Sequence, residues 1–329
     1  MIIGIDIGYY QTKWDREGGR KASFLSVSGT PDLPRFSIGG SSGRIVEVPS
    51  DGIWLVGGEA VEQSRFETKR EDRAWIRSKL YYRLFLAALA EATDETDVDV
   101  QIVTGLPLAY YSDNEVQRQL FLGEHRVRLG DRDYWQQFNV TDCVSLPQPL
   151  GTVFSEILDD DGQFVNEEYM DLLGCIDVGG KTTNVQAVNR PDPETLHEIA
   201  RETFFIDVGG WDLTRRIQVY LAKRCPDLDL RDHEIAKAII QGWVRYHGKK
   251  VDITDTVNTM SSDLIDQIVG GATSAWGSGA QLTTVLVTGG GALLMGPRIA
   301  AQFRQARVVE RPITANAEGY RRYGRRLWG

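Results

Sequence analysis

The sequence has 329 residues, a length that predicts about two domains, and it carries a formal net charge of −9. Hydrophobic residues make up 42% and charged residues 25%, so the chain as a whole is neither disordered, nor collagen-like, nor a coiled coil. The acidic balance argues against nucleic-acid binding by the whole surface, although it leaves room for a local basic patch.

The cysteines Cys143, Cys175 and Cys225 are far apart and form no C-x-x-C pair, and the four histidines show no ligand spacing. An odd number of isolated cysteines argues against a disulfide framework or a zinc site and predicts a reducing cytoplasm. The opening MIIGIDIG has neither a basic region nor a long apolar stretch, so we expect no signal peptide and no membrane span.

The first half of the sequence predicts strands that alternate with helices. The predicted strands and β-rich segments are 2–5, 11–15, 27–52, 54–58, 99–104 and 127–143. The predicted helices are 70–92, 112–122 and 148–158, and a capping box from Ser112 to Glu115 is expected to open the second of them. The acidic run 159–162 is interpreted as a solvated turn at a domain boundary rather than a metal site.

The second half shows the same alternation. Its predicted strands are 174–176, 204–208 and 283–288, and its predicted helices are 212–223, 232–241, 254–269 and 317–328. Strands that alternate with helices in both halves indicate an α/β architecture. The basic, aromatic segment 321–328 is interpreted as a solvated helix face, with an acidic neighbouring subunit or an adaptor as the alternative partner.

An internal repeat links the two halves. Ile5-Asp6-Ile7-Gly8 recurs as Ile176-Asp177-Val178-Gly179, 171 residues later. A threonine follows each aspartate by six residues, at Thr12 and at Thr183. Each copy follows an apolar strand and is expected to turn back as a hairpin, so the sequence predicts two duplicated halves.

The residue types in the repeat suit phosphate binding. A glycine after the strand lets backbone amides approach an anion, and a terminal aspartate can hold Mg²⁺ through water. Lys13 can add a positive charge, and a third cluster, Gly289-Gly290-Gly291, can bring backbone against a nucleoside. Each element alone is usually an ordinary turn, so the prediction rests on the three together. The similar run 206–209 lacks the threonine and the hairpin, and is interpreted as a strand-to-helix turn.

These motifs resemble the superfamily of actin, the heat-shock chaperone ATPases and the sugar kinases, over nearly the whole chain. More narrowly, the chain is similar to the bacterial and archaeal actin-like proteins of the ParM/StbA plasmid-segregation type. The most specific match is Gly105-Leu106-Pro107-Leu108 followed by Tyr110-Tyr111. The other matches are Asp6 to Lys13 and Asp177 to Thr183 (phosphate hairpins), Pro147-Gln148 (first connector), Gly210 to Thr214 (start of the fourth subdomain), Gly289 to Gly291 (adenosine motif) and 315–320 (second connector).

The resemblance implies an α/β, actin-like fold of the duplicated ribonuclease H-like kind, with two related domains around a nucleotide cleft. Domain I would comprise residues 1–158 and 312–329, and domain II residues 159–311. Gln148 would orient the attacking water, Asp177 would take its proton, and Asp6 and Asp177 would hold Mg²⁺ through water. The cofactor-binding residues would be Gly8, Tyr9, Lys13, Gly179, Gly180, Thr182, Gly210, Glu234, Lys237, Gly289, Gly290 and Gly291.

Some positions remain open at this point. Tyr9-Tyr10 stand where actin has small residues, which puts a side-chain contact to the terminal phosphate in doubt. Lys181 is interpreted as pointing to solvent, with a phosphate contact as the alternative. Glu234 and Lys237 resemble purine-contacting residues, but their spacing equally suits a surface i,i+3 ion pair.

The function that the resemblance implies is a slow nucleoside triphosphatase, using ATP or GTP with Mg²⁺, whose subunits form filaments. Its partners would be other copies of itself and a DNA-binding adaptor, with no direct DNA contact and no membrane. The alternatives are a small-molecule kinase of the same superfamily and a non-hydrolysing scaffold of the pilus-assembly type. A kinase would need a catalytic aspartate near an acceptor pocket, and no second acidic motif of that kind is found.

Overall fold

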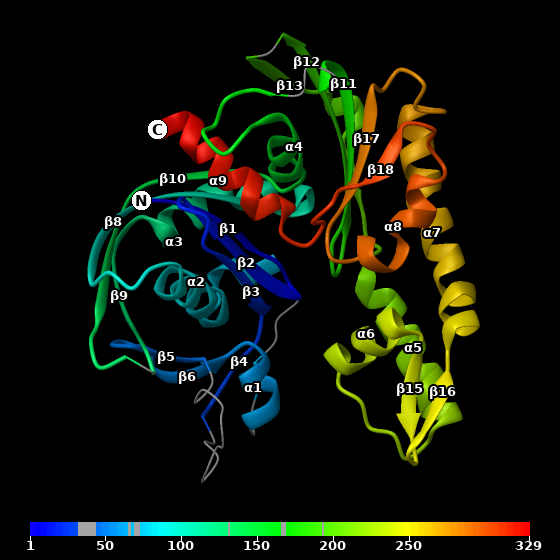
Figure 1. Cartoon of the computed structure of the whole chain (residues 1–329), viewed down its shortest axis with the longest axis horizontal. Coiled ribbons are helices and arrows are strands. Elements are labelled where there is room, and N and C mark those ends of the chain that lie inside the picture. Colours follow the sequence, from blue (N-terminus) through cyan, green and yellow to red (C-terminus); the bar gives the residue numbers. More distant parts are fainter. Residues whose placement is uncertain (32–43, 65–66, 69–72, 131, 166–168, 193) are drawn as a thin grey trace. The chain divides into compact units, whose positions relative to one another are not determined.

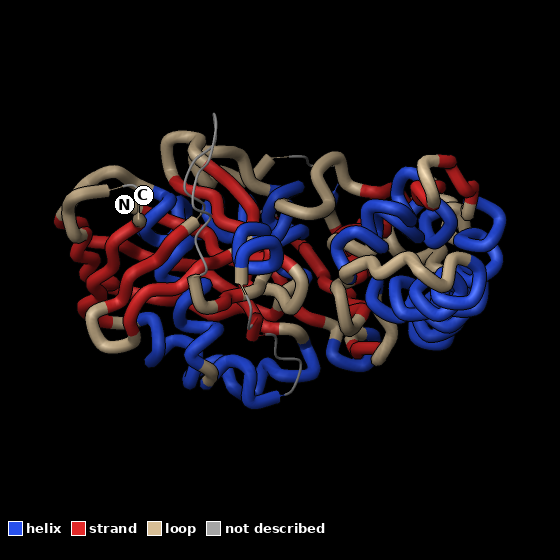
Figure 2. Tube along the Cα trace, turned by 90° about the horizontal axis from the view of Figure 1, so that it is seen from below, coloured by secondary structure: helices blue, strands red, loops and turns tan. Residues whose placement is uncertain are grey.

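The structure is a computed structural model, and it describes residues 1–31, 44–64, 67–68, 73–130, 132–165, 169–192 and 194–329. The chain forms two compact units (Figure 1). The first comprises Met1–Asn166 and Thr314–Gly329, and the second comprises Glu167–Ile313. Each unit combines strands with helices (Figure 2), as the alternating pattern predicts.

The first unit contains a sheet with the strand order β3-β2-β1-β8-β10-β9-β5-β6-β4-β7. β1 lies parallel to β8, which lies parallel to β10, and β2 pairs antiparallel with β1. The strands are β1 Ile2–Ile7, β2 Gln11–Arg16, β3 Lys21–Leu25, β4 Ser28–Gly29, β5 Ile45–Val48, β6 Gly52–Val56, β7 Glu67–Thr68, β8 Asp97–Leu106, β9 Gly123–Leu129 and β10 Gln136–Pro147. The helices are α1 Gly58–Gln63, η1 Arg73–Arg77, α2 Lys79–Ala92, η2 Leu108–Asp113, α3 Asn114–Phe121, α4 Pro149–Ile157 and α9 Ala315–Trp328.

Two helix predictions in the first unit are wrong. The helix expected over 70–92 is divided at Ser78, whose extended backbone ends η1 and whose Oγ accepts a hydrogen bond from Tyr81 N at 3.2 Å as the N-cap of α2. The expected capping box is absent, because Ser112 belongs to η2 and α3 begins at Asn114. Residues 70–72 of that predicted helix, and 32–43 of the predicted β-rich segment 27–52, lie outside the described residues.

The second unit contains a sheet with the order β13-β12-β11-β17-β18, in which β14 also pairs with β12, and a separate hairpin of β15 and β16. The strands are β11 Asp171–Val178, β12 Thr183–Asp192, β13 Thr195–Glu198, β14 Phe204–Ile206, β15 Trp243–Tyr246, β16 Lys249–Asp252, β17 Thr284–Thr288 and β18 Ala306–Val308. The helices are η4 Ala200–Glu202, α5 Gly210–Arg224, α6 Asp232–Gln241, α7 Thr254–Trp276 and α8 Ala292–Ala300. α7 runs beyond the predicted end at residue 269, because the buried side chains Ala272 and Trp276 extend its apolar stripe.

The two units repeat one arrangement of strands. In the first unit Asp6 pairs with Lys13 and Ile7 with Thr12, and 171 residues later Asp177 pairs with Asn184 and Val178 with Thr183. The turns match as well, because Gly8 N donates to Gln11 O at 3.0 Å and Gly179 N to Thr182 O at 2.9 Å. The leading strand of each unit also has a parallel neighbour, β8 or β17. The repeat in the sequence is therefore a repeat of structure.

The observed division of the chain differs from the predicted one near residue 158. Leu158 forms a β-bridge with Phe164, and Arg321 Nη2 of α9 donates to Asp160 Oδ1 at 2.6 Å. These contacts keep the acidic turn in the first unit, which therefore extends to Asn166. Near the other boundary, Gly289 N donates to Pro312 O at 2.9 Å and keeps that proline in the second unit.

The acidic turn is exposed at its centre, as its composition predicts, and the C-terminal arginines bind it and its surroundings. Arg321 and Arg322 both contact Asp160, and Arg321 also pairs with Asp15 at 3.4 Å. Arg325 pairs with Glu17 at 2.8 Å, and the guanidinium of Arg326 lies over the ring of Phe164. The predicted alternative of a basic surface for an acidic partner is not supported, since these four arginines bind within their own unit.

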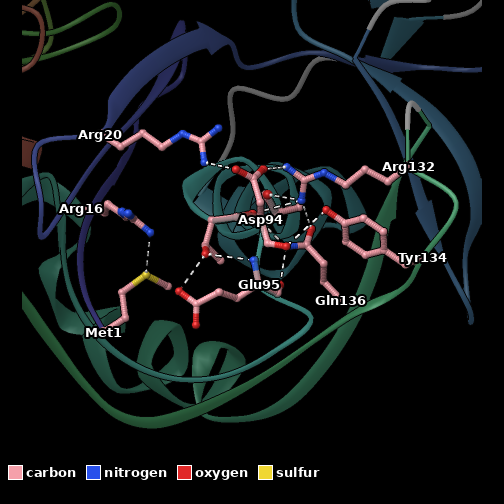
Figure 3. A network of polar contacts seen from close by, with 10 residues as sticks. Met1, Arg16, Arg20, Asp94, Glu95, Arg132, Tyr134 and Gln136 are labelled. Carbon is pink, nitrogen blue, oxygen red and sulfur yellow. Dashed lines mark hydrogen bonds and ion pairs between the residues drawn. The ribbon is translucent and has the colours of Figure 1, made fainter.

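A network of hydrogen bonds holds the segment between α2 and β8 in the first unit (Figure 3). Asp94 accepts hydrogen bonds from Arg20 at 2.9 Å and from Arg132 at 2.7 Å, so one carboxylate joins the β2–β3 and β9–β10 connections. Gln136 Nε2 donates to the carbonyls of Thr93 and Glu95, each at 2.9 Å. The network uses its polar groups internally, and we assign it a structural role.

The helices α4 and α9 cross at a pair of glycines. A Cβ atom at Gly319 would lie 1.7 Å from the carbonyl oxygen of Gly151, so the backbones approach more closely than any side chain allows. Asn316 Oδ1 accepts hydrogen bonds from the backbone N and the Oγ1 of Thr152, at 3.0 and 2.7 Å. Because α4 and α9 are the last and the first helices of the two chain segments of this unit, the crossing joins those segments.

The substitution Gly319→Ala tests this crossing. The obstructing atom belongs to the backbone and cannot rotate away, so we expect the free energy of unfolding to fall by more than about 2 kcal/mol. The control is Gly270→Ala on α7, where nothing lies within 4 Å of the added Cβ and we expect a gain of up to about 1 kcal/mol. Urea unfolding of both variants provides the measurement, and equal stabilities would contradict the close crossing.

His125 gives the first unit a predictable response to pH. Its Nε2 lies 2.7 Å from Phe121 O and its Nδ1 2.9 Å from Tyr82 Oη, an arrangement that suits the neutral ring. Burial lowers the pKa of His125 below 6.5, so the unfolded chain takes up the proton first as the pH falls. The contribution of the neutral His125 ring to the free energy of unfolding is therefore fully present above pH 6.5. It is lost as the pH falls from 6.5 toward the pKa of His125 in the folded state. Replacement by Gln should flatten this part of the unfolding free energy against pH, whereas His197→Gln at an exposed position should not.

Candidate functional site

The first unit brings three predicted site residues together at the end of β1. Asp6 is 1% exposed, and its Oδ2 accepts a hydrogen bond from Lys13 Nζ at 3.0 Å. Its Oδ1 accepts from Gln148 Nε2 at 2.8 Å. Lys13 reaches Asp6 because the two residues pair across the β1–β2 hairpin, and Gln148 stands directly before α4. A buried carboxylate thus has a cation on one oxygen and an amide on the other, as burial of a charge requires.

The backbone and side chain of Gln148 are both held in place. Its N donates to Leu106 O at 2.8 Å, and its O accepts from Gly151 N and from Tyr320 Oη, each at 3.1 Å. Because an ionised carboxylate only accepts hydrogen bonds, the NH₂ of Gln148 faces Asp6 and its Oε1 is turned away. Tyr320, which is fully buried, is a positioning residue that the sequence analysis did not identify.

Tyr9, at the turn of the first hairpin, belongs to an aromatic cluster. Its ring stacks on Trp75 with centroids 5.1 Å apart, and meets Tyr110 edge-on at 6.4 Å. Trp75 in turn contacts Tyr81 at 5.0 Å, and Tyr81 Oη accepts a hydrogen bond from Gln117 Nε2 at 2.6 Å. The tyrosine that departs from the actin pattern therefore packs the hairpin against η1 and η2. No spacing in the sequence predicted the contact between Tyr9 and Trp75.

In the second unit, Asp177 is the last residue but one of β11 and is 2% exposed. The third glycine cluster packs directly against this strand end. Gly289 has φ +89°, and a Cβ there would lie 2.4 Å from Asp177 Oδ1 and from Val178 O. Gly291 N donates to Val178 O at 2.8 Å, and a Cβ on Gly291 would collide with the Val178 side chain. The glycines are needed here because β11, β17 and α8 approach one another so closely.

The turn of the second hairpin contacts the start of α5. Gly210 N donates to Gly179 O at 3.0 Å, and Trp211 N donates to Gly180 O at 2.8 Å. The segment 206–209 before α5 is a strand-to-helix turn, as predicted, and Gly209 N donates to Asp212 Oδ2 at 2.8 Å. In this unit Asp177, the turn from Gly179 to Thr182, Gly210 and the cluster 289–291 therefore lie together.

The predicted glycines have a role in packing. Five of their own amides donate to carbonyls of the protein, and a contact between these turns and an anion or a nucleoside stays a prediction. The five are Gly8, Gly179, Gly210, Gly289 and Gly291. These glycines bring turns and strands into close contact. Gly290, where an added Cβ would meet nothing within 4 Å, is different.

The remaining predicted positions lie elsewhere on the second unit. Glu234 and Lys237 are exposed on α6, and Glu234 Oε2 accepts a hydrogen bond from Arg231 N at 2.9 Å. This contact caps the start of α6, so the structure gives Glu234 a local role. Thr182 is buried and Lys181 is partly buried in the second hairpin turn. A purine contact by Glu234 and Lys237 stays a prediction.

The donor groups fit Mg²⁺ held by a nucleotide better than a metal held by protein alone. Within the described part of the chain, no group of three or more His, Cys, Asp or Glu residues could hold a metal ion. Mg²⁺ commonly keeps several waters and binds through one or two carboxylates together with substrate phosphates. Asp6 in the first unit and Asp177 in the second, each one residue before the end of the leading strand, are buried carboxylates of that kind.

Two other predictions concern cysteines and the membrane. All three cysteines are free and buried, as expected for a chain without disulfides. Burial raises the pKa of the Cys143 thiol to about 12, so this thiol is protonated and unreactive at neutral pH. Among the described helices, none combines the length and the apolar character that a membrane span requires.

Comparison with known proteins gives matches along most of the chain. Residues 4–151 match the family model described as actin-like proteins N-terminal domain, and residues 175–301 match archaeal actin homologue MreB-like, C-terminal. Archaeal actin homologs of Thermoplasma volcanium and Thermoplasma acidophilum are each 26% identical to this chain, over 98% of it and 98% of their own length.

Solved structures show the same fold. A crystal structure of an archaeal actin homolog has a TM-score of 0.83 with 21% identity, and a 15-stranded ParM filament from Clostridium botulinum has 0.83 with 20% identity. An archaeal actin homolog in complex with ADP has a TM-score of 0.80 with 22% identity. Each of these comparisons covers 99% of both chains. The predicted α/β, actin-like fold is confirmed.

The packing of the third glycine cluster can be tested by two adjacent substitutions. We expect Gly289→Ala to destabilise the protein by about 2 kcal/mol or more, because φ +89° and the contact with Val178 O both oppose a Cβ. Gly290→Ala, where the space is open, should leave the free energy of unfolding within about 0.5 kcal/mol of the parent. Thermal unfolding provides the measurement, and the reverse order of stabilities would contradict the packing described here.

Proposed function

The chain belongs to the actin-like proteins, and we propose that it binds and hydrolyses a nucleoside triphosphate with Mg²⁺ and assembles into nucleotide-dependent filaments. The observation that carries this proposal is the duplicated strand and hairpin, in which each unit has a buried carboxylate one residue before the end of its leading strand. The pairing of Asp6 with Lys13 and Gln148 adds the charge and the amide that phosphoryl transfer uses.

The proposal gives each of these residues a role. Lys13, released from Asp6, would carry its positive charge to a phosphate, and Asp6 and Asp177 would hold the metal's water ligands. Bound Mg²⁺ would neutralise phosphate charge. Gln148, fixed through its NH₂, would accept a hydrogen bond from the attacking water at Oε1, and Asp177 would take the proton. An amide cannot act as a base, so we expect slow hydrolysis, which suits a timer of assembly.

Several further proposals follow from the family. The protein's partners would be other copies of itself and a DNA-binding adaptor, and its filaments would move plasmid or other DNA. The acidic charge of −9 supports an adaptor over direct DNA contact. The fold shared with a ParM filament supports self-assembly, and the three buried free cysteines support a reducing cytoplasm.

Phosphate release by Asp177→Ala tests the hydrolytic part of the proposal. We expect turnover to fall to background because the variant loses both the proton acceptor and a carboxylate for Mg²⁺. Since Asp177 is buried against Gly289, far-ultraviolet circular dichroism must show a folded protein. The conservative Asp177→Asn variant, which keeps the shape of the side chain, should be equally inactive. Undiminished phosphate release in either folded variant would contradict the assignment.

Electron microscopy of the purified protein with ATP, GTP and ADP tests the filament part. We expect filaments with a triphosphate and fewer with the diphosphate. Absence of filaments with all three nucleotides would contradict assembly, and transfer of phosphate to a sugar in a substrate panel would favour the kinase alternative instead.

A further inference from the structure

The hairpin of β15 and β16 carries a concentration of positive charge. Residues 243–250 include Arg245, Lys249 and Lys250 and no carboxylate, in a chain whose formal net charge is −9. These three cations are exposed. Asp252, at the base of the hairpin, accepts a hydrogen bond from Thr254 N at 2.8 Å and so serves the start of α7.

The hairpin has a tight turn and places two of its three cations, Arg245 and Lys250, on one face. Its turn residues His247 and Gly248 both have positive φ, at 45° and 79°, as tight two-residue hairpin turns require. Arg245 Nη1 donates to Gly248 O at 3.0 Å and braces the turn. Val244 is buried in the core of the second unit. Because side chains alternate along a strand, Trp243 and Arg245 lie on the opposite face.

That opposite face places two like charges across from each other. Arg245 and Lys250 are directly paired across the strands, and both lie over the ring of Trp243, at 5.9 and 4.2 Å from its centroid. Like charges in directly opposed positions destabilise a hairpin. The aromatic ring offsets part of this repulsion, and a carboxylate from outside the hairpin would offset more.

The turn between β12 and β13 has the opposite charge. Asp192 and Glu194 are exposed there, Glu198 is exposed at the far end of β13, and Arg190, the nearest cation along β12, is buried. Hydrogen bonds from Thr195 and from Glu194 N lower the pKa of Asp192, so this carboxylate is ionised at neutral pH. Figure 1 shows the β12–β13 turn and the β15–β16 hairpin at opposite ends of the second unit.

From this arrangement we infer that the β15–β16 hairpin of one copy binds the acidic β12–β13 turn of the next copy, as a head-to-tail contact of the filament. Complementary surfaces at opposite ends of one body give a heterologous contact, which leads to open assemblies. The inference rests on the proposed self-assembly and names the surfaces that would carry it. A second copy is favoured over nucleic acid because the charge outside the hairpin is strongly negative and would repel a polyanion.

Charge reversal at each surface, followed by mixing, tests the contact. One variant is Arg245→Glu/Lys250→Glu, which keeps a like-charged pair in the hairpin, and the other is Asp192→Lys/Glu194→Lys. Each variant alone would place like charges at every contact, so we expect its critical concentration to rise about tenfold or more in sedimentation assays. In an equal mixture each reversed surface meets its complement on the other variant, and assembly should return.

A charge-matched control is Arg77→Glu/Arg126→Glu, two exposed positions in the first unit, and this variant should assemble like the parent. Circular dichroism and nucleotide-stimulated phosphate release by the unassembled variants check that they are folded. Recovery of assembly on mixing would itself show that both variants are folded.

The possible outcomes separate the two proposals. A parent protein that never assembles would overturn the filament proposal and this contact with it. A parent that assembles while both reversed variants assemble equally well would overturn the contact alone, as would failure of the mixture to recover. Binding of a fluorescent oligonucleotide that is lost in Arg245→Glu/Lys250→Glu, with assembly unchanged, would assign the hairpin to nucleic acid and overturn the contact between copies.

Discussion

Burial of one carboxylate at the end of the leading strand of each unit is the constraint on which the rest of the structure depends. Removing a carboxylate from water costs several kcal/mol unless it is paired and hydrogen-bonded. At Asp6 this cost is offset by hydrogen bonds from Lys13, across the hairpin, and from Gln148, directly before α4. The requirement therefore fixes the register of β1 and β2 and the position at which β10 gives way to α4.

The glycines follow from the same constraint. At Asp177 the surrounding turns come so close that a Cβ at Gly289 or Gly291 would strike β11. At the crossing of α4 and α9, Gly151 and Gly319 bring together the two helices that carry Gln148 and its support Tyr320. Close backbone contact at these points holds the polar groups in place, and it leaves few positions at which an ordinary side chain fits.

The repeat made much of this predictable from the sequence. Asp6 and Asp177, with a threonine six residues after each, indicated two related hairpins, and the strands and turns repeat in that register. Lys13 was named from the chemistry of the repeat and Gln148 from the resemblance, and both contact Asp6. The ends of the helices and of the two units depended on contacts between residues that are distant in sequence. The break at Ser78 and the inclusion of the acidic turn in the first unit by Arg321 have no local signal of comparable strength.

The sequence did not predict the structural role of some residues. A glycine after a strand suggested backbone amides that can approach an anion. The amides of Gly8 and Gly179 themselves donate hydrogen bonds that close their own hairpin turns. Tyr9 put a side-chain contact to the terminal phosphate in doubt. In the structure its ring packs on Trp75, which lies far away in sequence. The four arginines of α9 were interpreted as part of a solvated helix face, and they bind carboxylates, carbonyls and a ring of their own unit. Local turn closure decided the first case, and packing between distant residues decided the other two.

Hydrogen exchange of the backbone amides with and without Mg²⁺ and ATP tests the central claim most directly. If both hairpins hold the phosphates, the amides of residues 8–12 and 179–184 should exchange more slowly when nucleotide is bound, and Lys13→Ala should weaken the effect in both segments. Exchange that is unchanged by nucleotide in both hairpins, or slowed only elsewhere in the chain, would contradict the account.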